Sequence, residues 1–205
     1  MQKYKLGFAL ILSALVTACG SDNDSKAVVE TTPNPAMIRV IHASPDAPNV
    51  DITANGALFG GLAGVDYQVA SGLATIPSTN YTIGVVANTA GGQAEVLTTN
   101  FVARPDIQYN VLAIGNVADG SLELLRLAAN PAADAEGTTQ VQIVHAAPNA
   151  PAVDIYVTAP EANLAAEQPL ATAAYKDATG LVAVPSGDYQ IRITPAGADT
   201  VVFDS

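Results

Sequence analysis

The chain has 205 residues, of which 49% are hydrophobic and 13% are charged, with 19 Asp or Glu against 8 Lys or Arg. The resulting net charge of −11 argues against nucleic-acid binding, because proteins of that class neutralise phosphates with Lys and Arg. The hydrophobic content is high enough to build a folded core, which excludes a disordered chain. A single Cys excludes an internal disulfide and a thiolate zinc cluster, and two His leave little for multi-His chemistry.

Residues 1–18 have the layout of an export signal. Two lysines precede an apolar run over 6–16, which is shorter than the roughly 20 residues needed to cross a bilayer. The run ends in Val16-Thr17-Ala18-Cys19, which resembles the lipobox of bacterial lipoproteins. The resemblance implies cleavage before Cys19 and its lipidation, with palmitate among the acyl groups, so that the mature protein is held in a membrane. An ordinary signal peptide with an incidental Cys is the alternative.

Residues 19–36 are polar and rich in Ser, Asp, Asn, Thr and Pro, a composition typical of a flexible tether. Gly20 follows Cys19 at the position where, in the lipoproteins it resembles, Asp favours retention in the inner membrane. We therefore expect a lipid-anchored protein of the bacterial cell envelope, in the outer rather than the inner membrane.

A long segment of the chain occurs twice. Residues 38–52 and 141–155 match at a constant offset of 103, with eight of 15 positions identical. From Tyr67 and Tyr175 onward the offset is 108, which places a five-residue insertion within 159–168. A repeat of this length indicates a duplicated domain rather than a solenoid unit.

The repeat predicts two tandem domains, at 37–127 and 140–205, joined by a linker over 128–139 that is rich in Ala, Asp, Pro and Gly. Measured against the first copy, the second lacks about 30 residues. We therefore expect it to be C-terminally incomplete.

Short alternating segments predict an all-β fold with almost no helix. Residues 81–85 and 189–193 alternate apolar with small or polar residues, and 93–102 is rich in Val and Thr. Asn55-Gly56 and Asp119-Gly120 each predict a two-residue type I′ hairpin turn, in which both residues have positive φ. Seven or eight strands in a copy predict immunoglobulin- or transthyretin-like β-sandwiches.

A tyrosine follows a Pro-containing turn at the same place in each copy. Tyr81 comes after Pro77, and Tyr189 comes after Pro185. Both resemble the tyrosine corner of immunoglobulin-like sandwiches, in which the ring packs in the core and the hydroxyl bonds to upstream backbone. A buried tyrosine at a strand start is the alternative, and both interpretations are structural.

Three polar residues within ten positions are the best candidate for a ligand site: His42, Asp46 and Asp51. Their counterparts in the second copy are His145, Asn149 and Asp154. An imidazole with two carboxylates is a plausible ligand set for calcium or another metal. The Asn in the second copy weakens this hypothesis, because Asn is a poor ligand for zinc-like metals, although calcium tolerates it.

Turn architecture explains the same residues, and we favour it. Alternation places the side chain of His42 on the apolar strand face of Ile38 and Val40. The segments that follow the His are rich in proline, which has no N–H and fixes φ, and Asp side chains bond neighbouring backbone amides in such turns. These prolines are Pro45, Pro48, Pro148 and Pro151.

Catalytic sequence signatures are absent: the chain has no G-x-S-x-G, no H-E-x-x-H, no phosphate-binding G-x-x-x-x-G-K-[ST] and no G-x-G-x-x-G after a strand. We therefore expect no enzyme and no cofactor.

Residues 39–51 read R-V-x-H-A-S-P-D-A-P-x-V-D, and 185–189 read P-S-G-x-Y. These motifs resemble the family called domain of unknown function 4397, over 37–127 and 139–205. The resemblance implies an exported bacterial protein with tandem β-sandwich copies and implies no functional residues.

Together these observations predict a lipid-anchored envelope protein that serves as a non-catalytic binding, adhesion or spacer module. Its lipid would bind the membrane, and its partner would be an envelope or extracellular protein or glycan. The alternative is a calcium- or metal-dependent ligand-binding protein that uses the repeated His/Asp motif.

Overall fold

The computed structural model describes residues 33–130 and 135–205. The export signal, Cys19 and most of the expected tether lie outside the described residues. Within them the regular structure is almost entirely strand, and the one helical segment is the 3₁₀ turn η1 (Leu164–Ala166). The predicted all-β class is therefore confirmed. None of the helical structure in these residues has the length and apolarity to cross a membrane.

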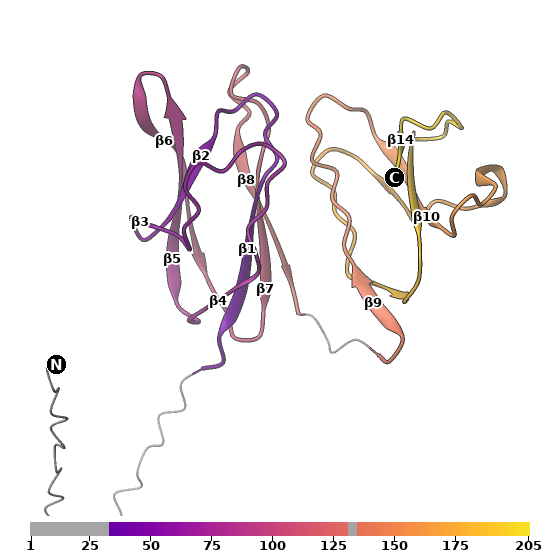
Figure 1. Ribbon diagram of the computed structural model, residues 1–205, viewed down its shortest axis with the longest axis horizontal. Helices are drawn as coiled ribbons and strands as arrows, with labels where there is room; N and C mark the ends of the chain where they lie inside the picture. The colour runs from indigo at the N-terminus through magenta and orange to yellow at the C-terminus, as the bar shows by residue number, and fades with distance from the viewer. Residues whose placement is uncertain (1–32, 131–134) are drawn as a thin grey trace, which may run out of the picture. The chain divides into compact units, whose positions relative to one another are not determined.

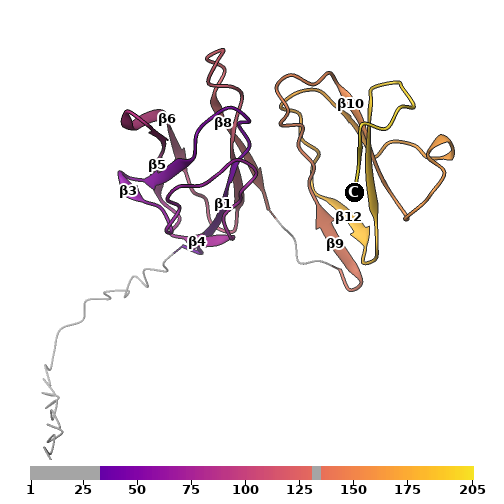
Figure 2. The ribbon, with the colours of Figure 1, turned by 45° about the horizontal axis from the view of Figure 1, so that its top comes forward.

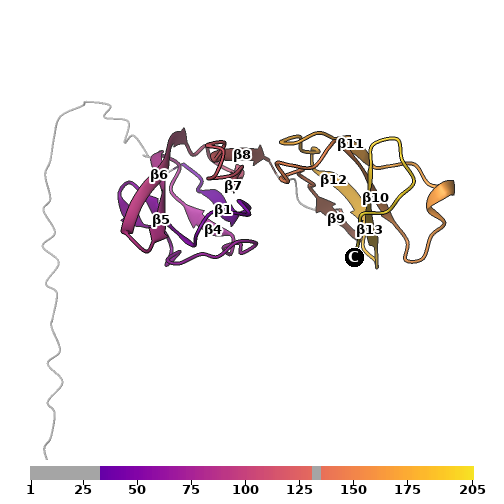
Figure 3. The ribbon, with the colours of Figure 1, turned by 90° about the horizontal axis from the view of Figure 1, so that it is seen from above.

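The first half folds into two four-stranded sheets, ordered β4-β1-β7-β8 and β3-β2-β5-β6. Figures 1 and 3 show them as two layers, with β1, β7 and β8 in one and β2, β5 and β6 in the other. The strands are β1 (Ala36–His42), β2 (Val50–Ala54), β3 (Ala57–Leu58), β4 (Ala74–Ile76), β5 (Asn80–Thr89), β6 (Gly92–Val102), β7 (Gln108–Ile114) and β8 (Glu123–Ala129). All pairs in these sheets are antiparallel except β1 with β7, which is parallel.

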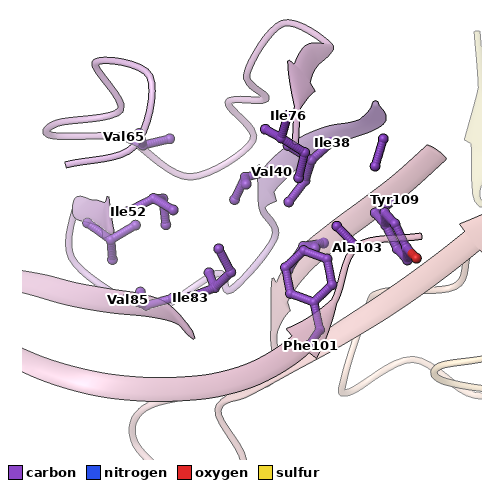
Figure 4. Packing of buried hydrophobic residues seen from close by; sticks show 13 residues of the cluster. Ile38, Val40, Ile52, Val65, Ile76, Ile83, Val85, Phe101, Ala103 and Tyr109 are labelled. Carbon is purple, nitrogen blue, oxygen red and sulfur yellow. The ribbon is translucent and has the colours of Figure 1, made fainter. Parts of the chain in front are cut away.

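Strand alternation builds the core between these two layers. Every second residue of β1 is buried, from Ala36 to His42, which places the apolar face of this strand inward. Figure 4 shows side chains from both sheets, such as Ile38 and Ile83, in the space between them. At one end of the core Phe101 packs against Tyr81 and Tyr109, with ring centroids 5.7 and 5.1 Å apart.

One of the two predicted hairpin turns is confirmed. Asn55 and Gly56 have φ of 52° and 79° and connect β2 to β3 with Ala54 opposite Ala57. The prediction at Asp119-Gly120 is wrong, because β7 and β8 are joined by a longer loop over 115–122 and, of these two residues, only Gly120 has positive φ. Gly120 donates to the carbonyl of Val117, and the Asp119 carboxylate accepts the Ser121 amide, so side-chain bonding reshapes this turn.

The second half contains a four-stranded sheet ordered β11-β10-β13-β14 and a two-stranded sheet of β12 with β9 (Figure 2). Its strands are β9 (Thr138–Val141), β10 (Val153–Thr158), β11 (Ala171–Ala173), β12 (Val182–Pro185), β13 (Gln190–Pro195) and β14 (Phe203–Asp204). Val153, Ile155 and Ala173 form its buried apolar cluster, with Ile143 and Ile193 packed against it.

The pairings of the two halves correspond at the offsets found in the sequence. β10 pairs with β13 as β2 pairs with β5, and β12 pairs with β9 as β4 pairs with β1. The amide of His42 donates to Val69 at 3.0 Å, and that of His145 donates to Asp177 at 2.9 Å. The repeated motif therefore occupies the same structural place in both halves.

Candidate functional site

His42 ends β1 on its buried face, with 2% of its surface exposed. Nε2 lies 3.2 Å from the carbonyl oxygen of Pro48, and Nδ1 lies 3.4 Å from the amide nitrogen of Ser44. A carbonyl only accepts and a backbone amide only donates, so Nε2 carries the proton and Nδ1 accepts. Both nitrogens of this neutral ring thus bond to the turn that follows β1.

The second copy repeats this geometry. His145 lies 3.0 Å from the Pro151 carbonyl through Nε2, and its Nδ1 accepts from the Ala147 amide at 3.3 Å. The same tautomer follows. In each copy a tyrosine ring packs edge-on against the imidazole. The ring centroids are 6.3 Å apart for Tyr67 and His42 and 6.4 Å apart for Tyr175 and His145.

Asp46 binds the loop between β7 and β8. One carboxylate oxygen accepts from the amide of Val117 at 2.8 Å and the other from that of Ala118 at 2.9 Å. These two bonds, the one from Ala118 foremost, hold the pKa of Asp46 below its usual 3.8. Ser44 binds the same loop, because its buried hydroxyl donates to the carbonyl of Gly115 at 2.7 Å.

Asp51 connects three segments on the outer side of β2. It accepts from the Asn88 side chain at 2.8 Å, from the Gly64 amide at 2.7 Å and from the Gln93 side chain at 2.8 Å. The bond from Asn88 is the main cause of its lowered pKa. Asp154 accepts from the Thr172 hydroxyl and from the Gly197 amide, and its pKa is lowered chiefly by Thr172.

The three candidate ligands of the first copy do not converge. His42 points into the core, whereas Asp51 alternates with buried neighbours on β2 and so faces outward. Asp46 is directed at the loop after β7. Across the parts of the chain that the structure describes, no three His, Cys, Asp or Glu side chains are grouped closely enough to hold a metal ion.

The ring of His42 also borders an apolar hollow of about 100 Å³ at one end of the first sandwich. Its lining includes Val50, Val85, Ala113 and Leu122. Binding sites for small molecules usually measure roughly 300–1,000 Å³. This hollow has room for a fragment only.

The two corner tyrosines donate to upstream backbone. The Tyr81 hydroxyl lies 3.2 Å from the Pro77 carbonyl, and the Tyr189 hydroxyl lies 2.7 Å from that of Pro185. The Tyr81 ring packs against the core, whereas Tyr189 is 36% exposed. The hydroxyl bond is thus common to both, and core packing is found in the first only.

Sequence reasoning missed most partners of the motif. The bond from Ser44 to Gly115 and the bond from Asn88 to Asp51 join residues 71 and 37 positions apart. No local pattern encodes such separations. The pair Tyr67 and Tyr175, which marks the repeat at offset 108, was the available signal for the ring contact with the histidines.

These contacts define an all-β sandwich protein in which the repeated His and Asp residues brace turns. The model of the family Domain of unknown function (DUF4397) matches residues 36–156, more than half of the chain. The chain belongs to this family, as the motif over 39–51 predicted. The family model matches no residue beyond Tyr156, whereas the resemblance in the sequence motifs extends to Ser205. No curated protein matches the chain.

Proposed function

We propose that the protein is a lipid-anchored component of the bacterial cell envelope whose β-sandwich fold serves as a non-catalytic binding module. The N-terminal sequence supports the anchor: an export signal ends in a lipobox-like segment at Cys19, and a polar tether follows. About 0.8 kcal/mol for each buried CH₂ then holds the lipid chains in the membrane.

One observation carries the non-catalytic part of the proposal: both histidines use both ring nitrogens in bonds to their own turns. A general base needs an imidazole nitrogen within reach of a substrate proton. Neither ring offers one without breaking a bond that shapes the fold. Asp46, Asp51 and Asp154 are likewise bonded to backbone amides or side chains.

The calcium- or metal-dependent alternative uses the same residues and requires them to exchange these partners for a cation. The side chain of His42 points from β1 into the core, whereas that of Asp51 points outward from β2. A shared ion therefore also requires the first sandwich to rearrange. We therefore place binding elsewhere on the fold.

Anchoring is tested by expressing the full chain and its Cys19→Ala variant in a bacterial host and separating membranes from soluble fractions. The wild-type protein should sediment with membranes, and mass spectrometry should find acyl groups on Cys19. Density separation of the two membranes then tests the expected outer location. Cys19→Ala protein that stays in the membrane fraction to the same extent would contradict lipid anchoring.

A further inference from the structure

A second feature of the first sandwich is a hollow of about 500 Å³ where the edge strands β6 and β8 face each other across the opening between the sheets. Its lining includes Asn100, Phe101, Arg104, Tyr109 and Arg126. A smaller hollow of about 330 Å³ shares Asn100, Phe101 and Arg126 with it. The volume falls within the range of ordinary ligand sites.

Arg126 occupies an unusual position for a cation. In the register of β7 with β8 it lies opposite the buried Val111, so both side chains are on the inner face of the sheet. Because β8 is an edge strand, Arg126 reaches the opening and stays exposed, with its guanidinium 5.7 Å from the centre of the Phe101 ring. This contact orients the guanidinium without neutralising it.

Arg104 reaches the same hollow from the connection between β6 and β7. Its amide donates to the Tyr109 hydroxyl at 3.0 Å, and that hydroxyl lies 3.2 Å from the Val102 carbonyl, so the backbone here is fixed. Within the described ranges neither Arg104 nor Arg126 forms an ion pair. An inward-pointing charge on an edge strand also blocks unwanted strand pairing, which would explain Arg126 but not the loop residue Arg104.

The charge around this hollow is opposite to that of the chain. Two of the eight basic residues line it, and none of the 19 acidic residues does so among the residues that the structure describes. Asn100 adds a further donor, because its Oδ1 accepts from the Thr82 hydroxyl and its Nδ2 has no partner in the described part of the chain. The hollow therefore presents hydrogen-bond donors to an acceptor-rich, negatively charged ligand.

An amide-rich surface continues from this hollow. A neighbouring hollow of about 500 Å³ on β5 and β6 shares Asn100, Phe101 and Val102 with the first, and its lining adds Asn55, Asn80 and Thr82. Amide and hydroxyl side chains suit a partner with many hydroxyl groups.

We infer that this groove, defined by Asn100, Phe101, Arg104 and Arg126, binds an acidic polysaccharide, with the two guanidiniums holding sugar carboxylates and the amide surface holding hydroxyls. Each sugar of a uronic-acid polymer carries both groups, one carboxylate and free hydroxyls. Bidentate pairing with carboxylates is the interaction for which a guanidinium is best shaped. This inference rests on the proposed binding function and assigns it a ligand class and a place.

The test measures binding of the full-length protein in neutral detergent to polygalacturonate at 0.15 M salt. Fully methyl-esterified polygalacturonate, which keeps the sugar chain and lacks the charge, is the matched ligand control. The wild-type protein should bind the free acid and not the ester. Arg104→Gln and Arg126→Gln should each weaken binding about tenfold, the loss expected for one charge-assisted bond.

Lys176→Gln is the protein control for net charge, because it removes one exposed positive charge outside the groove and should leave binding unchanged; unlike the two arginines, Lys176 is paired with a carboxylate, that of Glu123. Thermal unfolding of each variant separates lost binding from lost folding, and Arg126→Lys should recover only part of the affinity because it lacks the planar fork. Equal binding of the ester, undiminished binding of the Arg variants, or equal binding of poly-L-glutamate would each overturn the inference.

Failure here is distinguishable from failure of the proposed function. If another envelope component binds the wild-type protein and the Arg104→Gln/Arg126→Gln double variant equally well, the binding module stands and this site is wrong. Membrane fractionation of Cys19→Ala reports on the anchor independently of either result.

Discussion

Replacing His42 with Phe tests whether the repeated motif is architecture. The substitution keeps an aromatic ring at a position that is 2% exposed and removes both bonds of the imidazole. The Pro48 carbonyl and the Ser44 amide then lose their partners. A buried polar group left unsatisfied costs about 1–3 kcal/mol, and because the bond to Ser44 is long, at 3.4 Å, we expect a total of about 2–3 kcal/mol.

That loss should be visible in urea unfolding followed by circular dichroism, and as a fall in Tm of roughly 10–15 °C for a domain of about 100 residues. His42→Gln places an N–H donor near the position of Nε2 and should cost about half as much. His145→Phe is the matched variant in the second copy. The reasoning is refuted if His42→Phe unfolds like the wild-type protein.

Three further perturbations follow from the same structure. Gly115→Ala should destabilise the protein by at least about 2 kcal/mol in urea unfolding, because φ is 85° and an added Cβ would lie 2.2 Å from the Ser121 carbonyl oxygen; a neutral result would mean that the loop relaxes freely. Tyr81→Phe should cost about 1 kcal/mol, the usual net value of one hydrogen bond, and an unchanged Tm would count against the corner bond. Acid should destabilise the fold, because folding lowers the pKa values of Asp46 and Asp51 below 3.8. Their stabilising effect is complete at pH values above the pKa of the unfolded state, and it is lost as the pH falls through the pKa of the folded state. A Tm series should therefore be level above about pH 5 and fall below about pH 4, and a Tm that holds to pH 2 would show that these bonds contribute nothing.

Local signals in the sequence predicted the fold class and several elements. Alternation located the strands around Ile83 and Ile193, and Asn55-Gly56 predicted its turn because positive φ at two successive residues is a local requirement. The prediction at Asp119-Gly120 was wrong because the Asp119 side chain bonds within the loop, which dipeptide preference does not register.

The pairing between distant strands could not be predicted from the sequence. The parallel pairing of β1 with β7 joins segments about 70 residues apart. The pairing of β8 with β7 then places Arg126 opposite Val111, at the opening of the sandwich. Arg104 and Arg126 belong to separate elements and carry no shared motif, so only the folded chain places them in one groove. The burial of His42, by contrast, could be predicted, because strand alternation places its side chain on the same face of β1 as Ile38 and Val40.

Thermal unfolding of the full-length protein, first with EDTA and then with added calcium or zinc, tests the central claim most directly. A ligand that binds only the folded state at 100 times its Kd adds about 2.7 kcal/mol to the free energy of unfolding. If His42, Asp46 and Asp51 brace turns, Tm stays the same in EDTA and in either metal. A rise in Tm with metal that disappears in His42→Gln or Asp51→Asn would contradict the account and make the repeated motif a metal site.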